Sequence, residues 1–216
     1  VLTLDRGGDF RCGACWRASG NQLHLEKELY YPDSLGDLYG RVTELLGFES
    51  RADEHKVQWL AASGDDRFTG LFLELMGTEK GGWPRLERSF FSSDRLSHGG
   101  FSARFYERLG LADGAPVPAE LRPAVAAGLQ RAIEQTVAEM AGRGENLCLA
   151  GGLAFNALLV ASLERSPRWR NVFVQPAAGN TGTALGGAFW AWHVLYGQTA
   201  RGGIGNLCLG PEYQPE

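Results

Sequence analysis

Two strand–helix pairs follow each other along the last third of the chain. Apolar segments of strand length, Asn146–Ala150 and Asn171–Gln175, each lead into a segment with helical periodicity, Ala154–Glu164 and Thr181–Tyr196. A strand–helix–strand–helix order is typical of a parallel sheet, because each helix returns the chain to the edge where the next strand begins. This order predicts an α/β fold.

Three strand-like segments open the chain, and short turns separate them. Val1–Asp5, Arg11–Ala18 and Gln22–Tyr31 are divided by Gly7-Gly8-Asp9 and Ser19-Gly20-Asn21. Turns of this kind join antiparallel neighbours, so we expect a mixed sheet of five strands. Three antiparallel strands, a helical stretch and two parallel strand–helix units are the order of one ribonuclease-H-like subdomain, the unit that is doubled in actin-like ATPases. No internal repeat is visible, so we expect at most one copy.

Helical patterns fill most of the chain between these two groups of strands. Ser34 is expected to cap a first helix that runs from Leu35 to Leu46 and ends at Gly47. Residues 77–100 have low periodicity and are expected to form an irregular excursion. The further helices that we predict are Glu54–Ala62, Arg67–Met76, Gly100–Gly110 and Ala119–Arg143.

The composition allows an ordinary core and argues against several partners. With 216 residues, of which 44% are hydrophobic, the chain can form one compact domain or two tightly packed lobes. A net charge of −4 makes double-stranded nucleic acid a poor partner, although RNA bound by a small local patch stays open. No apolar stretch reaches the roughly 20 residues that a bilayer span requires. We therefore expect a cytoplasmic protein without nucleic-acid or membrane partners.

Four cysteines, at positions 12, 15, 148 and 208, are expected to be free thiols. Cys12 and Cys15 lie in a run that has the pattern of a strand, whereas redox motifs place such a pair at a helix N-terminus. A single C-x-x-C without a histidine at ligand spacing is weak evidence for zinc.

The turn Asp5-Arg6-Gly7-Gly8-Asp9 is the first candidate site, because it directly follows a strand. Glycines at a strand end let a phosphate approach backbone N–H groups, and a carboxylate there can hold magnesium or its water shell. Taken alone, a β-turn with two solvated aspartates explains this turn better.

The run Leu147–Asn156 is the second candidate, because its strand ends in Gly151-Gly152 and passes into a helix. Bare backbone and the positive end of a helix meet there, where an anionic or ring-bearing ligand can dock. Asn156 is expected to project from the first helical turn with a donor and an acceptor available for a base or ribose. The glycines can equally serve tight packing of the helix on the sheet.

The run Val172–Ala188 is the third candidate, another strand followed by a loop and a helix rich in Gly and Ala. Asn180 or Thr181 is expected to cap that helix. Small residues in its first turns indicate that another helix or a ligand comes close.

Taken together, four runs in register resemble the nodulation and antibiotic O-carbamoyltransferase family across nearly the whole chain. They are Leu149–Asn156, Phe173–Gly186, Gly47-Phe48 with Glu54–Val57, and Leu209–Tyr213. The resemblance implies an actin-like fold and the formation of carbamoyl-adenylate from carbamoyl phosphate and ATP, followed by transfer of the carbamoyl group to a hydroxyl-bearing small molecule. It also implies Mg²⁺ with the ATP and a divalent metal such as iron in the full-length enzyme.

Carried over by motif, the resemblance assigns the nucleotide site to seven residues and a metal position to Asn180. Asp5 and Gly8 fall at the phosphates, Glu54 falls near the ribose hydroxyls with Lys56 beside it, and Gly151, Gly152 and Asn156 fall around the adenosine. The family usually places an aspartate at the position of Asn180, and an amide binds a hard cation less well than a carboxylate. Arg6 replaces a small residue in the phosphate turn, and Gln58-Trp59 replace a small or flexible pair.

The family's metal-binding histidine pair, spaced four residues apart on a helix, has no counterpart among His24, His55, His98 and His193. All four are interpreted as structural or surface residues.

The ends of the chain lead us to expect an internal fragment. The chain opens without an initiator Met, and residues 209–216 have the composition of a linker to a further domain. We therefore assign residues 1–208 to one nucleotide-binding subdomain with a helical insertion at about 50–143. Without the missing lobes, the fragment alone is expected to be inactive.

Two other functions stay open. One is half of a sugar-kinase-like or chaperone-type ATPase, which shares the fold but normally has different phosphate turns. The other is a non-catalytic nucleotide-binding or scaffold module, favoured if Arg6 and Asn180 reflect lost chemistry.

Overall fold

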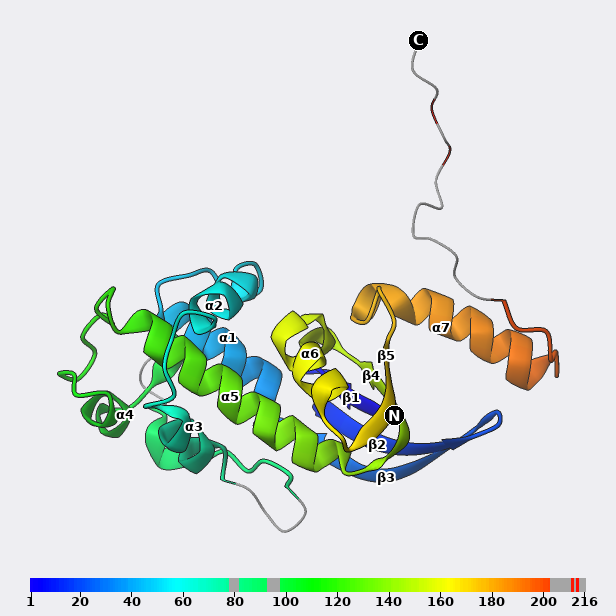
Figure 1. Ribbon diagram of the computed structural model, residues 1–216, viewed down its shortest axis with the longest axis horizontal. Coiled ribbons are helices and arrows are strands. Elements are labelled where there is room, and N and C mark those ends of the chain that lie inside the picture. The colour runs from blue at the N-terminus through cyan, green and yellow to red at the C-terminus, as the bar shows by residue number, and fades with distance from the viewer. Residues whose placement is uncertain (78–81, 93–97, 203–210, 212, 214–216) are drawn as a thin grey trace. The chain divides into compact units, whose positions relative to one another are not determined.

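The computed structural model describes residues 1–77, 82–92, 98–202, 211 and 213 (Figure 1). The chain divides into two compact units, Val1–Gly182 and Thr183–Glu216, which are described separately below. The expected boundary between residues 208 and 209 lies outside the described residues.

The first unit is built on a mixed sheet, which has five strands in the described part of the chain. Its strand order is β3-β2-β1-β4-β5, with the short strand β1 in the centre. The pairs β1–β2 and β2–β3 are antiparallel, whereas β1–β4 and β4–β5 are parallel. This confirms the expected mixed α/β sheet. The strands are β1 (Leu2–Leu4), β2 (Arg11–Ser19), β3 (Gln22–Tyr30), β4 (Gly144–Ala150) and β5 (Trp169–Val174).

The helices of the first unit begin and end close to their predicted bounds. Ser34 caps α1 as predicted, because the amide of Asp37 donates to its Oγ at 3.0 Å. The α-helices are α1 (Leu35–Leu45), α2 (Glu54–Ala61), α3 (Thr69–Met76), α4 (Ala103–Arg108), α5 (Arg122–Ala141) and α6 (Ala157–Arg165). The 3₁₀ turns are η1 (Arg88–Phe90), η2 (His98–Gly100), η3 (Gly152–Phe155) and η4 (Asn180–Gly182).

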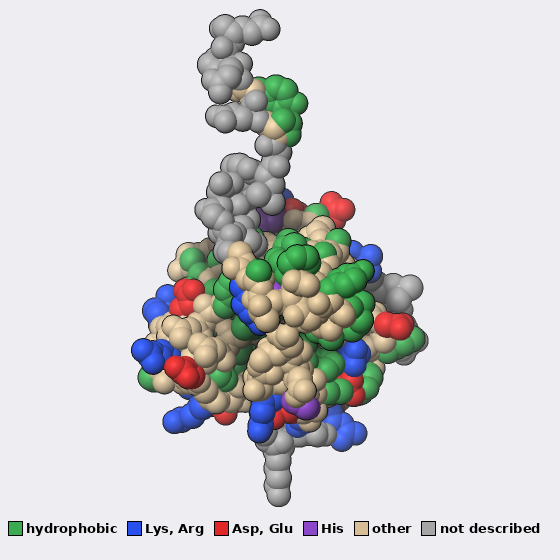
Figure 2. All heavy atoms as spheres, turned by 90° about the vertical axis from the view of Figure 1, so that its right-hand side faces the viewer, with side chains coloured by type: hydrophobic (Ala, Val, Ile, Leu, Met, Phe, Trp, Pro, Cys, Tyr) green, Lys and Arg blue, Asp and Glu red, His purple; other side chains and the backbone are tan. Residues whose placement is uncertain are grey.

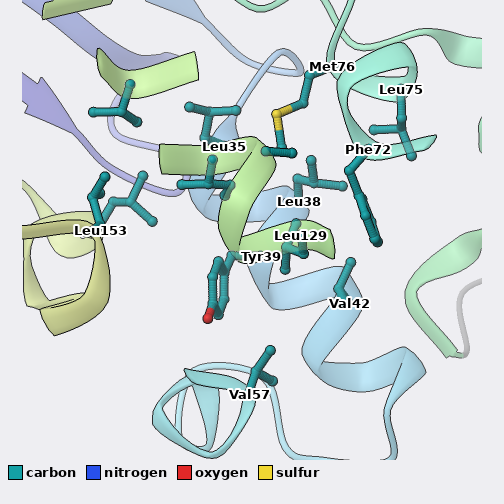
Figure 3. Close-up of a cluster of buried hydrophobic side chains, with 14 of the residues drawn as sticks. Leu35, Leu38, Tyr39, Val42, Val57, Phe72, Leu75, Met76, Leu129 and Leu153 are labelled. Carbon is teal, nitrogen blue, oxygen red and sulfur yellow. The ribbon is translucent and has the colours of Figure 1, made fainter. Parts of the chain in front are cut away.

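One continuous core joins the sheet to the helices. Leu2 and Leu4 of β1 are buried in it, and α5 carries it away from the sheet by packing against α2 and α3. The apolar stripe predicted on this long helix therefore has its partner. Figure 3 shows part of the core, with side chains from α1, α2, α3, α5 and η3: Leu35, Leu38, Tyr39, Val42, Val57, Phe72, Leu75, Met76, Leu129 and Leu153.

The predicted irregular excursion after α3 is irregular in the part that is described, yet it contributes to the core. Phe90 is fully buried. Its ring meets the ring of Phe105 from α4 edge to face, with centroids 6.4 Å apart. Aromatic packing thus holds a segment that has little regular secondary structure.

The second unit contains α7 (Thr183–Trp190), which continues into a π-helical turn, Ala191–Leu195. A single helix over Thr181–Tyr196 was predicted, so the prediction is correct in kind but misses the change of helix type. Within this unit the indole Nε1 of Trp192 donates to the carbonyl oxygen of Ala200 at 3.3 Å.

Three cysteines, Cys12, Cys15 and Cys148, are free thiols as predicted, and Cys208 lies outside the described residues.

Within the described part of the chain, no helix combines the length and apolar character needed to cross a membrane. Figure 2 shows basic and acidic side chains interspersed on the face in view.

Candidate functional site

The ends of two parallel strands meet at one edge of the sheet. Leu2 and Thr3 of β1 stand opposite Leu149 and Ala150 of β4, so the segments that follow both strands lie together. The amide of Gly152 donates to the Asp5 carboxylate at 2.8 Å. The first and second candidate sites predicted from the sequence are therefore parts of one site.

A cleft of about 320 Å³ lies at this edge, a volume within the range of small-molecule sites. Its walls come from Arg6, from α1, from the loop before α2, from α2 itself and from η3. Three residues assigned to nucleotide by resemblance, Glu54, Gly152 and Asn156, lie on these walls. The lining consists of Arg6, Gly36, Tyr39, Arg51, Ala52, Glu54, His55, Gln58, Gly152, Leu153, Phe155 and Asn156.

Glu54 is positioned by the tight loop that precedes α2. Its carboxylate accepts a hydrogen bond from the amide of Arg51 at 2.5 Å. Arg51 has a φ of 76°, in the left-handed region that non-glycine residues seldom occupy. The hydrogen bond holds the loop closed at the helix start, so Glu54 lies on the wall of the cleft.

Asn156 lies in the wall, but its amide is already engaged. Its Oδ1 accepts from the amide of Leu159 at 3.0 Å and thereby caps α6. The side chains of Asn156 and Gln130 also exchange two hydrogen bonds, of 2.8 and 3.1 Å. The expectation of a donor and an acceptor both free for a ligand is therefore wrong, because capping and Gln130 use them.

Gln130 links this wall to α1. The hydroxyl of Tyr39 donates to its Oε1 at 3.1 Å, and its own Nε2 donates to Glu134 at 2.8 Å. Burial raises the pKa of Tyr39, so the phenol stays protonated. Tyr39, Gln130 and Asn156 thus form a buried polar cluster at the wall of the cleft.

The remaining nucleotide assignments do not line the cleft. Gly8 lies in the turn between β1 and β2. The ammonium of Lys56 pairs with Asp53 at 2.8 Å. Gly151 has a φ of +92°, and a Cβ there would lie 2.2 Å from the carbonyl oxygen of Leu4, so close packing on β1 accounts for this glycine.

The structure adds lining residues that were not predicted as site residues. Phe155 follows the glycine pair, lines the cleft and is 56% exposed. Gln58 accepts from the amide of Ala157 at 3.1 Å and so helps to hold the start of α6. Both had a signal in the sequence, because Phe155 lies within the second candidate motif and Gln58 in the pair that departs from the family pattern.

The predicted metal position, Asn180, is the first residue of η4. Among the described residues, no three side chains of His, Cys, Asp or Glu are grouped so that they could hold a metal ion. The described residues by themselves therefore do not fit a divalent metal centre. The roles of Asn180 as a ligand and as a helix cap stay predictions.

The mixed sheet, its strand order and the cleft at its parallel strand ends define an actin-like subdomain of the α/β class. Residues 1–189 match the family described as carbamoyltransferase N-terminus. The chain belongs to this family, which confirms the resemblance seen in the four motifs.

Relatives of known sequence extend this match. The chain is 30% identical to nodulation protein NolNO of Sinorhizobium fredii and 31% identical to nodulation protein NolO of Bradyrhizobium diazoefficiens. Each match covers 98% of this chain, but 31% and 38% of the respective relatives. An uncharacterized protein of Synechocystis is 32% identical over 89% of the chain and 33% of its own length. The chain thus spans about a third of the length of these relatives.

Proposed function

We propose that the chain is the nucleotide-binding part of an ATP-dependent O-carbamoyltransferase. In this reaction one water hydrolyses carbamoyl phosphate to carbamate and phosphate. A carbamate oxygen then bonds to the α-phosphorus of ATP, whose bond to pyrophosphate breaks, and this gives carbamoyl-adenylate and free pyrophosphate. The carbamoyl group then passes to a hydroxyl oxygen of an acceptor and AMP leaves. Mg²⁺ enters with the ATP as part of the substrate.

The observation that carries the proposal is the cleft at the joined ends of β1 and β4. In open α/β sheets, ligands bind outside the carboxyl ends of the strands. Here bare backbone at Gly152 and the carboxylates of Asp5 and Glu54 lie at that edge. A carboxylate such as Glu54 can accept hydrogen bonds from ribose hydroxyls, whereas the exposed ring of Phe155 offers a flat apolar surface to a base.

A non-catalytic nucleotide-binding module is the second candidate, and one contact favours it. The amide of Gly152 already donates to Asp5, so a phosphate that used this amide would have to displace a carboxylate. Release of AMP that depends on carbamoyl phosphate separates the two candidates, since a module without catalysis produces none.

Gly152→Ala tests the site without disturbing the fold. A Cβ at this position would meet Asp5 Oδ1 at 3.5 Å, an ordinary contact, so the methyl group enters the cleft without strain. In the natural protein that contains this chain, we expect the KM for ATP to rise several-fold with unchanged thermal stability. Gly70→Ala on α3, where a Cβ meets nothing within 4 Å, is the matched control. Unchanged ATP kinetics in Gly152→Ala would remove the cleft from the nucleotide site.

A further inference from the structure

The cleft carries more positive than negative charge on its lining. Arg6 and Arg51 each contribute a guanidinium group, and Glu54 contributes the one carboxylate among the described lining residues. Arg51 comes from a loop before α2 and is exposed, whereas Arg6 directly follows the strand end of β1. Arg6 is thus only two residues from the end of β1, at the edge where β1 and β4 meet.

The side chain of Arg6 is held in place by helix α1. Its Nε donates to Asp37 at 3.2 Å and its Nη1 donates to Ser50 Oγ at 2.7 Å. Two glycines of α1 make room for this residue, Gly36 for its backbone and Gly40 for its guanidinium group. A Cβ at Gly36 would lie 3.0 Å from Arg6 Cα, and a Cβ at Gly40 would lie 2.8 Å from Arg6 Nη1. Glycine inside a helix costs roughly 0.5–1 kcal/mol relative to alanine, so the close approach of Arg6 outweighs helix propensity at both positions.

The charge of Arg6 is only partly neutralised by its ion pair. Asp37 is shared, because its other oxygen accepts from Arg41 Nε at 2.7 Å. Two guanidinium groups thus face one carboxylate, and a positive charge is left over. The hydrogen bonds that Arg6 makes within the described part of the chain use Nε and Nη1, so Nη2 remains for another acceptor. Arg6 is about one-third exposed, and of the two arginines that face Asp37, Arg6 lines the cleft and Arg41 does not.

We propose that Arg6 binds a phosphate oxygen of the ligand in this cleft, an inference that rests on the proposed function and adds a residue to its site. A guanidinium that is fixed by two protein contacts presents its remaining N–H groups in a defined direction, which suits phosphate oxygens. The ligand is an anionic phosphate ester or anhydride. MgATP and carbamoyl phosphate share this chemistry, and the experiment distinguishes them.

The test compares Arg6→Gln, Arg6→Lys and Arg41→Gln in the natural protein that contains this chain. Arg41→Gln is the matched control, because it removes a charge from the same carboxylate but lies off the cleft. Calorimetry measures binding of MgATP, carbamoyl phosphate, pyrophosphate and adenosine. Thermal unfolding of each variant verifies that it is folded.

We expect Arg6→Gln to weaken binding of the phosphate-bearing ligand by about 10- to 100-fold, the size expected for a hydrogen bond to a charged group. Adenosine binding is expected to stay unchanged, Arg6→Lys is expected to fall between wild type and Arg6→Gln, and Arg41→Gln is expected to stay within about threefold of wild type. Weaker binding of MgATP and pyrophosphate identifies the nucleotide phosphates as the ligand. Weaker binding of carbamoyl phosphate alone identifies the acyl phosphate.

Three results would overturn the inference. In the first, Arg6→Gln binds every phosphate-bearing ligand as tightly as wild type. In the second, Arg41→Gln weakens binding equally, which would mean that the ion pair acts through the fold. In the third, adenosine binding falls as much as MgATP binding. If the wild type binds neither MgATP nor carbamoyl phosphate, the proposed function fails together with the inference.

Discussion

Replacing Asn156 with alanine removes a helix cap and breaks the buried cluster at the wall of the cleft in one step. Loss of an N-cap costs about 0.5–2 kcal/mol. The change also removes the two buried hydrogen bonds with Gln130, whose amide keeps Tyr39 and Glu134 as partners, and at about 0.5–1.5 kcal/mol each this loss costs about 1–3 kcal/mol. We therefore expect Asn156→Ala to lower the free energy of unfolding by about 2–4 kcal/mol. For a chain of this length, that lowers Tm by about 5–15 °C.

Two further variants separate these contributions. Asn156→Ser keeps a good cap but is too short to pair with Gln130, so it should recover the capping part of the loss. In the double variant Asn156→Ser with Gln130→Met, the amide that lost its partner is gone, but the buried Tyr39 hydroxyl loses its acceptor, so only part of the remaining loss should be recovered. Urea unfolding followed by circular dichroism measures each free energy. A value for Asn156→Ala within about 0.5 kcal/mol of wild type would refute the reasoning, since surface positions behave that way.

Two predictions concern the strands on either side of the centre of the sheet. Gly151→Ala should destabilise the protein by more than about 1 kcal/mol, because its positive φ and the carbonyl of Leu4 leave no place for a Cβ. A Tm equal to that of Gly152→Ala would contradict this. Burial raises the pKa of the Cys12 thiol to about 11, so the folded state favours the neutral thiol. Its stabilising contribution is complete below about pH 9 and is lost as the pH rises towards 11, by up to about 2 kcal/mol. The free energy of unfolding is measured against pH for wild type and Cys12→Ala. If both decrease equally between pH 9 and 11, the thiol makes no such contribution.

The secondary structure was predictable wherever the hydrophobic periodicity agreed with the turn and capping residues. The turn residues after β1 and β2, the cap at Ser34 and the stripe on α5 each had a local cause, and each element was found near its predicted bounds. The helix predicted over Thr181–Tyr196 begins two residues late, at Thr183, and changes to a π-helical turn at Ala191. A Cβ at Gly182 would lie 2.0 Å from the carbonyl of Ala177, so the chain makes a 3₁₀ turn there before α7 begins.

The site was predictable only where it follows strand ends. That Asp5 and Gly152 lie together follows from parallel pairing, which the order of elements predicts. The engagement of Asn156 by Gln130 did not follow from any local pattern, because the partner comes from the middle of a helix 26 positions earlier. Arg51 had no signal either, since its left-handed φ depends on the loop into which it folds.

The contact between Asp5 and Gly152 joins two segments that are 147 positions apart. The chain between them forms β2 and β3, the α-helices α1 to α5, and then β4, through which it returns to the same edge of the sheet. The entropy of closing such a loop grows slowly with its length, by about 0.6 kcal/mol for each doubling. Insertions or deletions in the loops between α3 and α5 therefore act only weakly on the strand ends. Homologues can vary in size between these two points without losing the geometry of the edge, whereas a one-residue change on either side of the contact would shift it.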